Sequence, residues 1–310
     1  MALQVQSLPF DPQALPGLSE RLLRSHHQNN YGGAVKRLNA IREQLAVTPY
    51  TAAPGFQLNG LKREELSAAN SMLLHELYFA SLGGAGKAPA PAFDLALAAT
   101  FGSMQRWREE FVAMGKALAG GSGWVLLTFN PREGRLANVW AADHTQSLAG
   151  GTPILALDMY EHAYHMDHGA AAGAYVDAFI ANIDWASVYE RYQHAVYAAS
   201  EPFGAAQDEV AGRVVLDVRR AAVYEQAATM LPGARWCDPA QVGRWAAELK
   251  PDREVIVYCV YGHEVGRATA LRLRAAGLDA RYLRGGIDGW QAARKPLVGK
   301  AAAPARGTPP

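Results

Sequence analysis

An acidic residue directly after an apolar run is the feature that most constrains how this chain can fold. Residues 153 to 157 are typical of a strand, Asp158 follows at once, and His162 comes four residues later. A buried carboxylate is costly unless it is paired or bound to a metal. From a strand end and the helix after it, Asp158 and His162 can face one metal ion. A salt bridge from Asp158 to a lysine or arginine is the alternative.

Two more histidines lie in amphipathic stretches upstream. His26 falls in a helix predicted from about Ser19 to Leu45, and His75 in one predicted from Lys62 to Leu82. A lone histidine on a helix is more often a surface or capped residue than a ligand. Together with Asp158 and His162, however, these residues would give a site of three histidines and one carboxylate, which suits a redox iron or manganese ion.

The composition excludes several classes of partner. The 310 residues include 30 basic and 29 acidic side chains, so we expect no nucleic acid or membrane partner. No apolar run approaches the length of a membrane span, and the N-terminus lacks the pattern of a signal peptide. Two cysteines, Cys237 and Cys259, are too few for a disulfide framework. We therefore expect a cytoplasmic protein with reduced thiols.

The pattern of helices and strands predicts two domains. Residues 1–197 begin with the two helices, which would form an antiparallel hairpin, and continue as an α/β half, giving an α+β fold. That half has predicted helices at 93–100, 103–118, 174–182 and 185–197, and predicted strands at 123–129, 135–141 and 153–157.

The second half has a different pattern. Residues 198–212 are poorly periodic and are predicted to be a linker. Residues 213–298 alternate apolar strands with helices, which is typical of an α/β domain with a parallel sheet. Residues 299–310 contain too little apolar content to fold and are predicted to be a flexible tail.

The first domain resembles the iron/manganese superoxide dismutase family through most of residues 7 to 197. The likeness rests on Leu8-Pro9-Phe10-Asp11, Ser25-His26-His27, Phe101-Gly102-Ser103, Gly121-Ser122-Gly123-Trp124, Asp158 to Tyr164 and Asn182-Ile183-Asp184-Trp185. It implies a helical hairpin packed on an α/β half, with the metal between them. It also implies superoxide as substrate and one iron or manganese ion per subunit, with His26, His75, Asp158 and His162 as ligands. The shared ligands do not distinguish iron from manganese.

The same resemblance assigns residues around the metal and shows where the chain departs from the family. His144 stands where some members have a histidine that hydrogen-bonds the bound solvent, which implies a catalytic role. The usual gateway histidine and tyrosine fall on Asn30 and Ala34. Tyr31 is the candidate to reach into the same funnel. Glu161 matches the residue that reaches across the family's dimer, so we expect a homodimer or higher homo-oligomer.

Cys259 introduces a second kind of chemistry. It follows an apolar strand and precedes a helix predicted from Val265 to Ala276. Backbone N–H groups and the helix dipole favour the thiolate there, although inert burial is the usual state of an isolated cysteine.

The surroundings of Cys259 resemble a rhodanese domain over about Val214 to Pro296. The matching motifs are Asp217-Val218-Arg219, Leu231-Pro232-Gly233-Ala234, Val257-Tyr258-Cys259 and Leu283 to Trp290. The resemblance implies that Cys259 takes a sulfane sulfur from a small sulfur donor as a persulfide and passes it to a thiol acceptor. Many single-domain rhodaneses have arginine five residues after the cysteine, where this chain has Glu264. That carboxylate would disfavour anionic donors such as thiosulfate unless Arg267 turns inward.

Two hypotheses follow. The first is an enzyme, an iron/manganese-type superoxide dismutase with a second, sulfurtransferase activity. In the alternative, the N-terminal domain is a non-dismutase iron/manganese-binding or redox-sensing module, and only Cys259 is reactive. The four ligands and His144 favour the first hypothesis, whereas Asn30 and Ala34 favour the second.

Overall fold

The computed structural model describes residues 2–84, 86–249 and 253–300. The chain divides into two compact units. Unit 1 comprises Met1–Ala90, Arg108–Thr128 and Ala137–Glu190, and unit 2 comprises Pro91–Trp107, Phe129–Leu136 and Arg191–Pro310. These bounds differ from the predicted domain boundaries, since unit 2 also takes in three segments of the first 197 residues, namely 91–107, 129–136 and 191–197.

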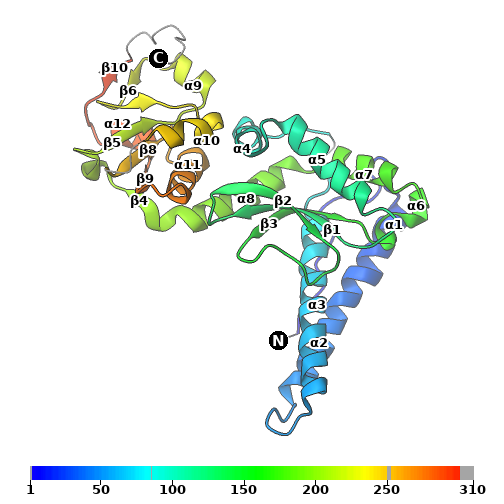
Figure 1. Ribbon diagram of the computed structural model, residues 1–310. Coiled ribbons are helices and arrows are strands. Elements are labelled where there is room, and N and C mark those ends of the chain that lie inside the picture. Colours follow the sequence, from blue (N-terminus) through cyan, green and yellow to red (C-terminus); the bar gives the residue numbers. More distant parts are fainter. Residues whose placement is uncertain (1, 85, 250–252, 301–310) are drawn as a thin grey trace. The chain divides into compact units, whose positions relative to one another are not determined.

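A helical hairpin opens unit 1, as predicted. Its first arm is α1 (Glu20–Ser25), a π-helical turn (His26–Tyr31) and α2 (Gly32–Ala46), and its second arm is α3 (Gly55–Phe79). The two arms run antiparallel beside each other (Figure 1). Ser19 caps the first arm, because its Oγ accepts a hydrogen bond from the Leu22 N–H at 3.1 Å. The π-helical turn begins at His26, and such turns often occur at functional sites.

The predicted three-stranded sheet is confirmed, in the order β2-β1-β3. Its strands are β1 (Trp124–Asn130), β2 (Arg135–Ala141) and β3 (Thr152–Asp158). Strand β3 is buried from Ile154 to Asp158, so the carboxylate lies at the buried end of an apolar strand. The helices of this part of the chain are α4 (Pro91–Phe101), α5 (Met104–Ala117), η2 (Glu161–Ala163), α6 (His165–His168), α7 (Ala172–Ala181) and α8 (Trp185–Ser200).

A five-stranded parallel sheet forms the centre of unit 2, which confirms the predicted α/β fold. Its order is β4-β9-β8-β5-β7, and every pair is parallel. The strands are β4 (Gly204–Ala205), β5 (Val214–Asp217), β7 (Arg235–Trp236), β8 (Val255–Tyr258) and β9 (Ala280–Leu283). The α-helices that follow β5 are α9 (Ala221–Gln226), α10 (Val242–Trp245), α11 (Glu264–Ala275) and α12 (Gly286–Ala292), and β6 (Thr229–Met230) pairs with β10 (Val298–Gly299).

The predicted linker at 198–212 is folded instead. Helix α8 continues to Ser200, β4 pairs with β9 as an edge strand, and the side chains of Ala205 and Val210 are buried. A two-residue edge strand is held by backbone hydrogen bonds, so it leaves no periodic pattern in the sequence. At the predicted tail, Gly299 pairs with Thr229, and residues 301–310 lie outside the described residues. Among the described helices, none has the length and apolar character needed to cross a membrane.

Candidate metal centre and cysteine site

The four predicted ligands converge in unit 1. One side-chain atom from each of His26, His75, Asp158 and His162 lies within 4.8 Å of the other three. They come from the π-helical turn, α3, the end of β3 and η2. The first three side chains are almost completely buried, and that of His162 is 25% exposed. The structure therefore brings together residues up to 136 positions apart in the sequence, counted from His26 to His162.

One carboxylate oxygen is the centre of this cluster. Asp158 Oδ2 lies 3.1 Å from His26 Nε2, 3.5 Å from His75 Nε2 and 3.2 Å from His162 Nε2. The Nε2 atoms of His75 and His162 are 3.4 Å apart. Three imidazole nitrogens thus share one carboxylate oxygen, an arrangement that hydrogen bonds alone do not satisfy.

The protonation of the ligands fits a cation. His75 Nδ1 lies 2.6 Å from the Ser71 carbonyl oxygen, and this hydrogen bond assigns the ring proton to Nδ1. Burial lowers the pKa of His75 to about 3, so the ring is neutral and Nε2 carries a lone pair. That lone pair faces Asp158 Oδ2. Two electron-rich atoms at this separation repel each other unless a positive ion lies between them, so the residues fit a metal ion.

Asp158 is held from several sides. Burial alone would raise its pKa, but the adjacent His162 and His26 hold the pKa well below its usual range. The Tyr160 N–H donates to Asp158 Oδ1 at 2.8 Å, and the Tyr175 hydroxyl donates to the Asp158 carbonyl oxygen at 2.7 Å. The carboxylate is therefore ionised and fixed in orientation.

His144 lies beside the cluster, in a position that the sequence alone did not explain. Trp124 Nε1 donates to His144 Nδ1 at 3.0 Å, which leaves the ring proton on Nε2. Burial lowers the pKa of His144, so the ring is neutral. The His144 ring stacks on the Tyr160 ring with 4.7 Å between their centroids, and the Tyr160 ring stacks on the His162 ring with 5.4 Å between theirs. Sequence reasoning identified Trp124 only as part of a motif and assigned no role to Tyr160.

A pocket joins His144 to the two positions where the chain departs from the family. It is lined by Asn29, Asn30, Gly33, Ala34, Arg37, Ser67, Ala68, Ser71 and His144. Contrary to expectation, Tyr31 lines a different pocket, together with Glu76. The Tyr31 hydroxyl donates to Glu76 at 2.8 Å and accepts from the Gln6 N–H at 2.9 Å, because a buried tyrosine requires polar partners.

Cys259 lies between β8 and α11 in unit 2 and is 5% exposed. Burial raises the pKa of its thiol, and hydrogen bonds from the backbone N–H groups of Gly266, Gly262 and His263 act in the opposite direction. A Cβ atom at Gly266 would lie 3.3 Å from Cys259 Sγ, and one at Gly286 would lie 2.5 Å from the Cys259 carbonyl oxygen. The loop therefore requires glycine at position 286, and Gly266 leaves little space for a larger side chain beside the sulfur.

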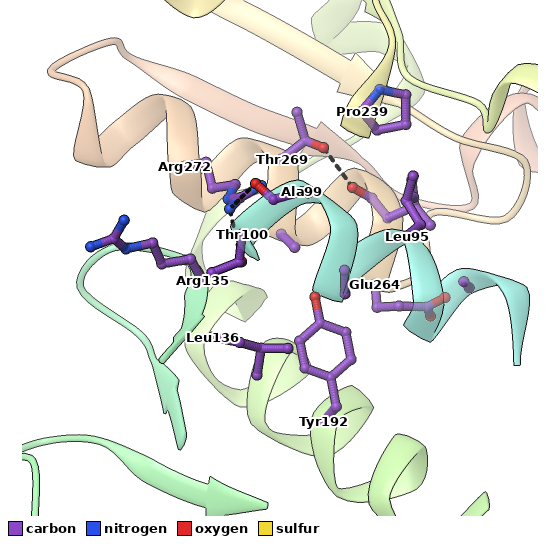
Figure 2. Close-up of a pocket in the computed structure, with 15 residues that line it drawn as sticks. Leu95, Ala99, Thr100, Arg135, Leu136, Tyr192, Pro239, Glu264, Thr269 and Arg272 are labelled. Atoms are coloured by element: carbon purple, nitrogen blue, oxygen red, sulfur yellow. Dashed lines mark hydrogen bonds between the residues drawn. The ribbon is translucent and has the colours of Figure 1, made fainter. Parts of the chain in front are cut away.

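Glu264, which follows this loop, also lines a pocket within unit 2. Its lining includes several alanine and leucine side chains, with Arg135, Tyr192, Glu264 and Arg272 as the larger polar groups (Figure 2). Arg272 donates to the Ala99 carbonyl oxygen at 2.9 Å and to Thr100 Oγ1 at 3.0 Å. The guanidinium is thus held by neutral oxygens.

The fold and the sites define a metalloprotein with a site for one redox ion. The chain also contains a parallel α/β domain in which backbone N–H groups surround a cysteine thiol. Residues 89–191 match the model of the iron/manganese superoxide dismutase C-terminal domain, and residues 204–293 match that of the rhodanese-like domain. The chain is 60% identical over 196 residues to a superoxide dismutase (Fe) of Cupriavidus metallidurans, covering 63% of this chain and 99% of that protein.

More distant relatives show the same likeness. A superoxide dismutase (Mn) of Halobacterium salinarum is 36% identical over 195 residues, covering 62% of this chain and 96% of that protein. A superoxide dismutase (Fe) of Aquifex aeolicus is 33% identical over 194 residues, covering 60% of this chain and 90% of that protein. The chain belongs to the iron/manganese superoxide dismutase family, and it carries a C-terminal rhodanese-like domain.

Proposed function

We propose that the chain dismutates superoxide to oxygen and hydrogen peroxide, with one iron or manganese ion held by His26, His75, Asp158 and His162. The observation that carries this proposal is the convergence of three Nε2 atoms on Asp158 Oδ2. The high identity to a relative named superoxide dismutase (Fe) supports it.

The chemistry of the site agrees with this reaction. When bound, iron or manganese supplies the change between two oxidation states that the reaction requires. Three neutral imidazoles and one carboxylate leave a trivalent ion with a net positive charge, which attracts an anionic substrate. The pocket beside Asn30 and Ala34 is the proposed entrance. His144 holds a proton on Nε2 beside the ligands and is the proposed donor toward the reacting oxygen.

A metal analysis of the full chain combined with a superoxide-decay assay tests the proposal. Iron or manganese at one ion per subunit, with decay accelerated in proportion to metal content, is the expected result. His75→Gln should lose most of the metal and the activity, whereas His194→Gln, an exposed histidine outside the centre, should retain both. Stoichiometric metal without accelerated decay would favour the alternative, a non-dismutase metal-binding or redox-sensing module.

We also propose that Cys259 accepts a sulfane sulfur as a persulfide and passes it to a small thiol. Three backbone N–H groups, the glycines around the sulfur and the match to the rhodanese-like domain support this role. Mass spectrometry of the full chain after exposure to a sulfur donor should show the added mass of one sulfur atom. Cys259→Ser should abolish the adduct, and Cys237→Ser, which changes the other buried thiol, should not. An adduct that survives in Cys259→Ser would refute the assignment.

We further propose a homodimer that acts in the cytoplasm. Glu161 is exposed on the single chain and adjoins His162, which fits a residue that reaches a partner subunit. Both cysteines are free thiols, which suits a reducing compartment. Sedimentation analysis of the full chain tests the dimer, and a monomer at micromolar concentration would contradict it.

A further inference from the structure

The two histidines that the helical hairpin contributes to the metal centre are oriented in different ways. His75 Nδ1 donates to the Ser71 carbonyl oxygen at 2.6 Å, so this ring is fixed from its own helix. His26 Nδ1 is buried and, among the residues that the structure describes, has no hydrogen-bond partner. The second nitrogen of a metal-binding histidine usually has such a partner, which sets the direction of the ring. The direction of the His26 ring therefore depends on its backbone and on the rings of Tyr78 and Phe79, whose centroids each lie 5.0 Å from its own.

The backbone of His26 belongs to the π-helical turn between α1 and α2. The Gly32 N–H bonds to the His27 carbonyl oxygen, five residues back, whereas an α-helix would use the residue four back. Each residue of an α-helix contributes about 100° of rotation, so a shift of one residue in the turn would rotate His26 by about that angle relative to α2. His26 Nε2 would then no longer face Asp158 Oδ2, which lies 3.1 Å away. The wide turn is therefore required for His26 to reach the other ligands.

The backbone of one residue, Gln6, supports this turn near both of its ends. The Gln6 N–H donates to the Tyr31 hydroxyl at 2.9 Å, and His27 Nε2 lies 2.8 Å from the Gln6 carbonyl oxygen. A carbonyl oxygen only accepts, so the His27 ring is the donor in the second hydrogen bond. The Tyr31 hydroxyl in turn donates to Glu76 Oε1 at 2.8 Å, and Glu76 follows the ligand His75 on α3. These contacts connect the turn to the other arm of the hairpin.

Gln6 is itself held in place by a second contact, three residues earlier. The Leu3 N–H donates to Asn39 Oδ1, and Asn39 Nδ2 donates to the Leu3 carbonyl oxygen, both at 2.9 Å. An extended chain covers about 10 Å from Leu3 to Gln6, and a helix covers about 12 Å over the eight residues from Tyr31 to Asn39. Because the two spans are similar, the segment Leu3–Gln6 can follow α2 with both of its ends attached. We call Leu3–Gln6 the strap.

We propose that the strap positions the metal ligand His26, acting through the side chains of His27 and Tyr31. This inference rests on the proposed function of the metal centre. His27 and Tyr31 contribute no ligand atom to the cluster. They are positioning residues that keep the turn wide, so the bound ion should be retained less well when either hydrogen bond to Gln6 is lost.

Tyr31→Phe tests this role, because it removes the hydroxyl that accepts from Gln6 and donates to Glu76 but keeps the ring. Tyr50→Phe is the matched control, since the Tyr50 hydroxyl donates to the Leu45 carbonyl oxygen at 2.9 Å in the same hairpin. Two measurements are made on the iron-loaded full chain, the rate of iron release to a chelator and the electron paramagnetic resonance spectrum of the ferric ion. We expect Tyr31→Phe to release iron about tenfold faster, since two hydrogen bonds are lost, and to show a changed spectrum. Tyr50→Phe should match the native chain in both measurements.

His27 provides an independent comparison. His27→Gln can still donate to the Gln6 carbonyl oxygen, whereas His27→Leu cannot. The rate of iron release should therefore be closer to the native rate in His27→Gln than in His27→Leu. This comparison also decides the inference if Tyr31→Phe does not fold, since equal rates in the two His27 variants would overturn it.

Hydrogen exchange of the backbone N–H groups of residues 27–32 separates this inference from the proposed function, because it is measured on the metal-free chain. Exchange should be faster in Tyr31→Phe than in the native chain and unchanged in Tyr50→Phe. Native exchange together with native iron release in Tyr31→Phe would overturn the inference and leave the proposed function intact. A native chain that binds neither iron nor manganese would instead refute the proposed function. A lower free energy of unfolding in Tyr31→Phe, with an unchanged spectrum and native iron release, would indicate a purely structural role and overturn the positioning role.

Discussion

The hydrogen bond from Trp124 to His144 is expected to contribute directly to superoxide turnover. Trp124 Nε1 donates to His144 Nδ1 at 3.0 Å and fixes the ring proton on Nε2. Trp124→Phe removes this donor and leaves the two tautomers free to exchange. A neutral hydrogen bond is worth about 0.5–1.5 kcal/mol, which corresponds to a rate loss of about 2- to 13-fold.

The assay is superoxide decay per bound metal ion, measured on the full chain by stopped flow. The metal content should stay at the native level, because Trp124 is not one of the four converging ligands. Trp107→Phe is the matched control, since Trp107 is equally buried but is not part of this hydrogen bond. Nitrogen chemical shifts of His144 in the metal-free protein report the tautomer. A Trp124→Phe chain with the native rate and a mixed tautomer would refute the proposed role of His144.

Three further changes test the surroundings of the two sites. Tyr175→Phe removes the donor to the Asp158 carbonyl oxygen, and denaturant unfolding should show a loss of about 1–3 kcal/mol with weaker metal retention. Arg219→Met should cost about 3–5 kcal/mol in the same measurement, because Asp217 is completely buried and would lose its paired charge. Burial and a nearby carboxylate raise the pKa of Tyr197 to about 12. The folded chain therefore keeps this proton while the unfolded chain loses it near pH 10, so the stability contribution is present below pH 10 and is lost as the pH rises toward 12. Ultraviolet titration of the native chain against Tyr197→Phe should show one tyrosine ionising late.

Two of the four candidate metal ligands, Asp158 and His162, could be predicted because they leave a local signal. An apolar run that ends in Asp158 indicates a buried carboxylate, and the spacing to His162 places both residues at one strand end. His26 and His75 were added through the family resemblance, since helical periodicity alone gives a lone histidine little weight. The structure confirms that all four side chains converge.

The environment of those ligands could not be predicted, because it depends on contacts between distant residues. Trp124 and His144 are 20 positions apart and meet only after the strands pair. The π-helical turn from His26 to Tyr31 is also invisible in the periodicity, and the Tyr31 side chain ends beside Glu76 instead of in the pocket lined by Ala34. A local pattern identifies a residue type at a position, whereas its partners follow from the fold.

Two buried carboxylates show how strongly the neighbouring residues determine the chemistry of a site. Asp158 and Glu264 both lie near a junction between a strand and a helix, and both are almost inaccessible to solvent. Around Asp158, three imidazole nitrogens converge on one oxygen, and the lone pair of His75 requires a cation among them. Around Glu264, the amide of Gln193 and the Tyr197 hydroxyl form hydrogen bonds to the carboxylate. The first environment therefore favours a bound cation, whereas the second holds its carboxylate through hydrogen bonds from α8. Because the residue types alone are so similar, the difference between the two sites follows from the groups that each carboxylate contacts.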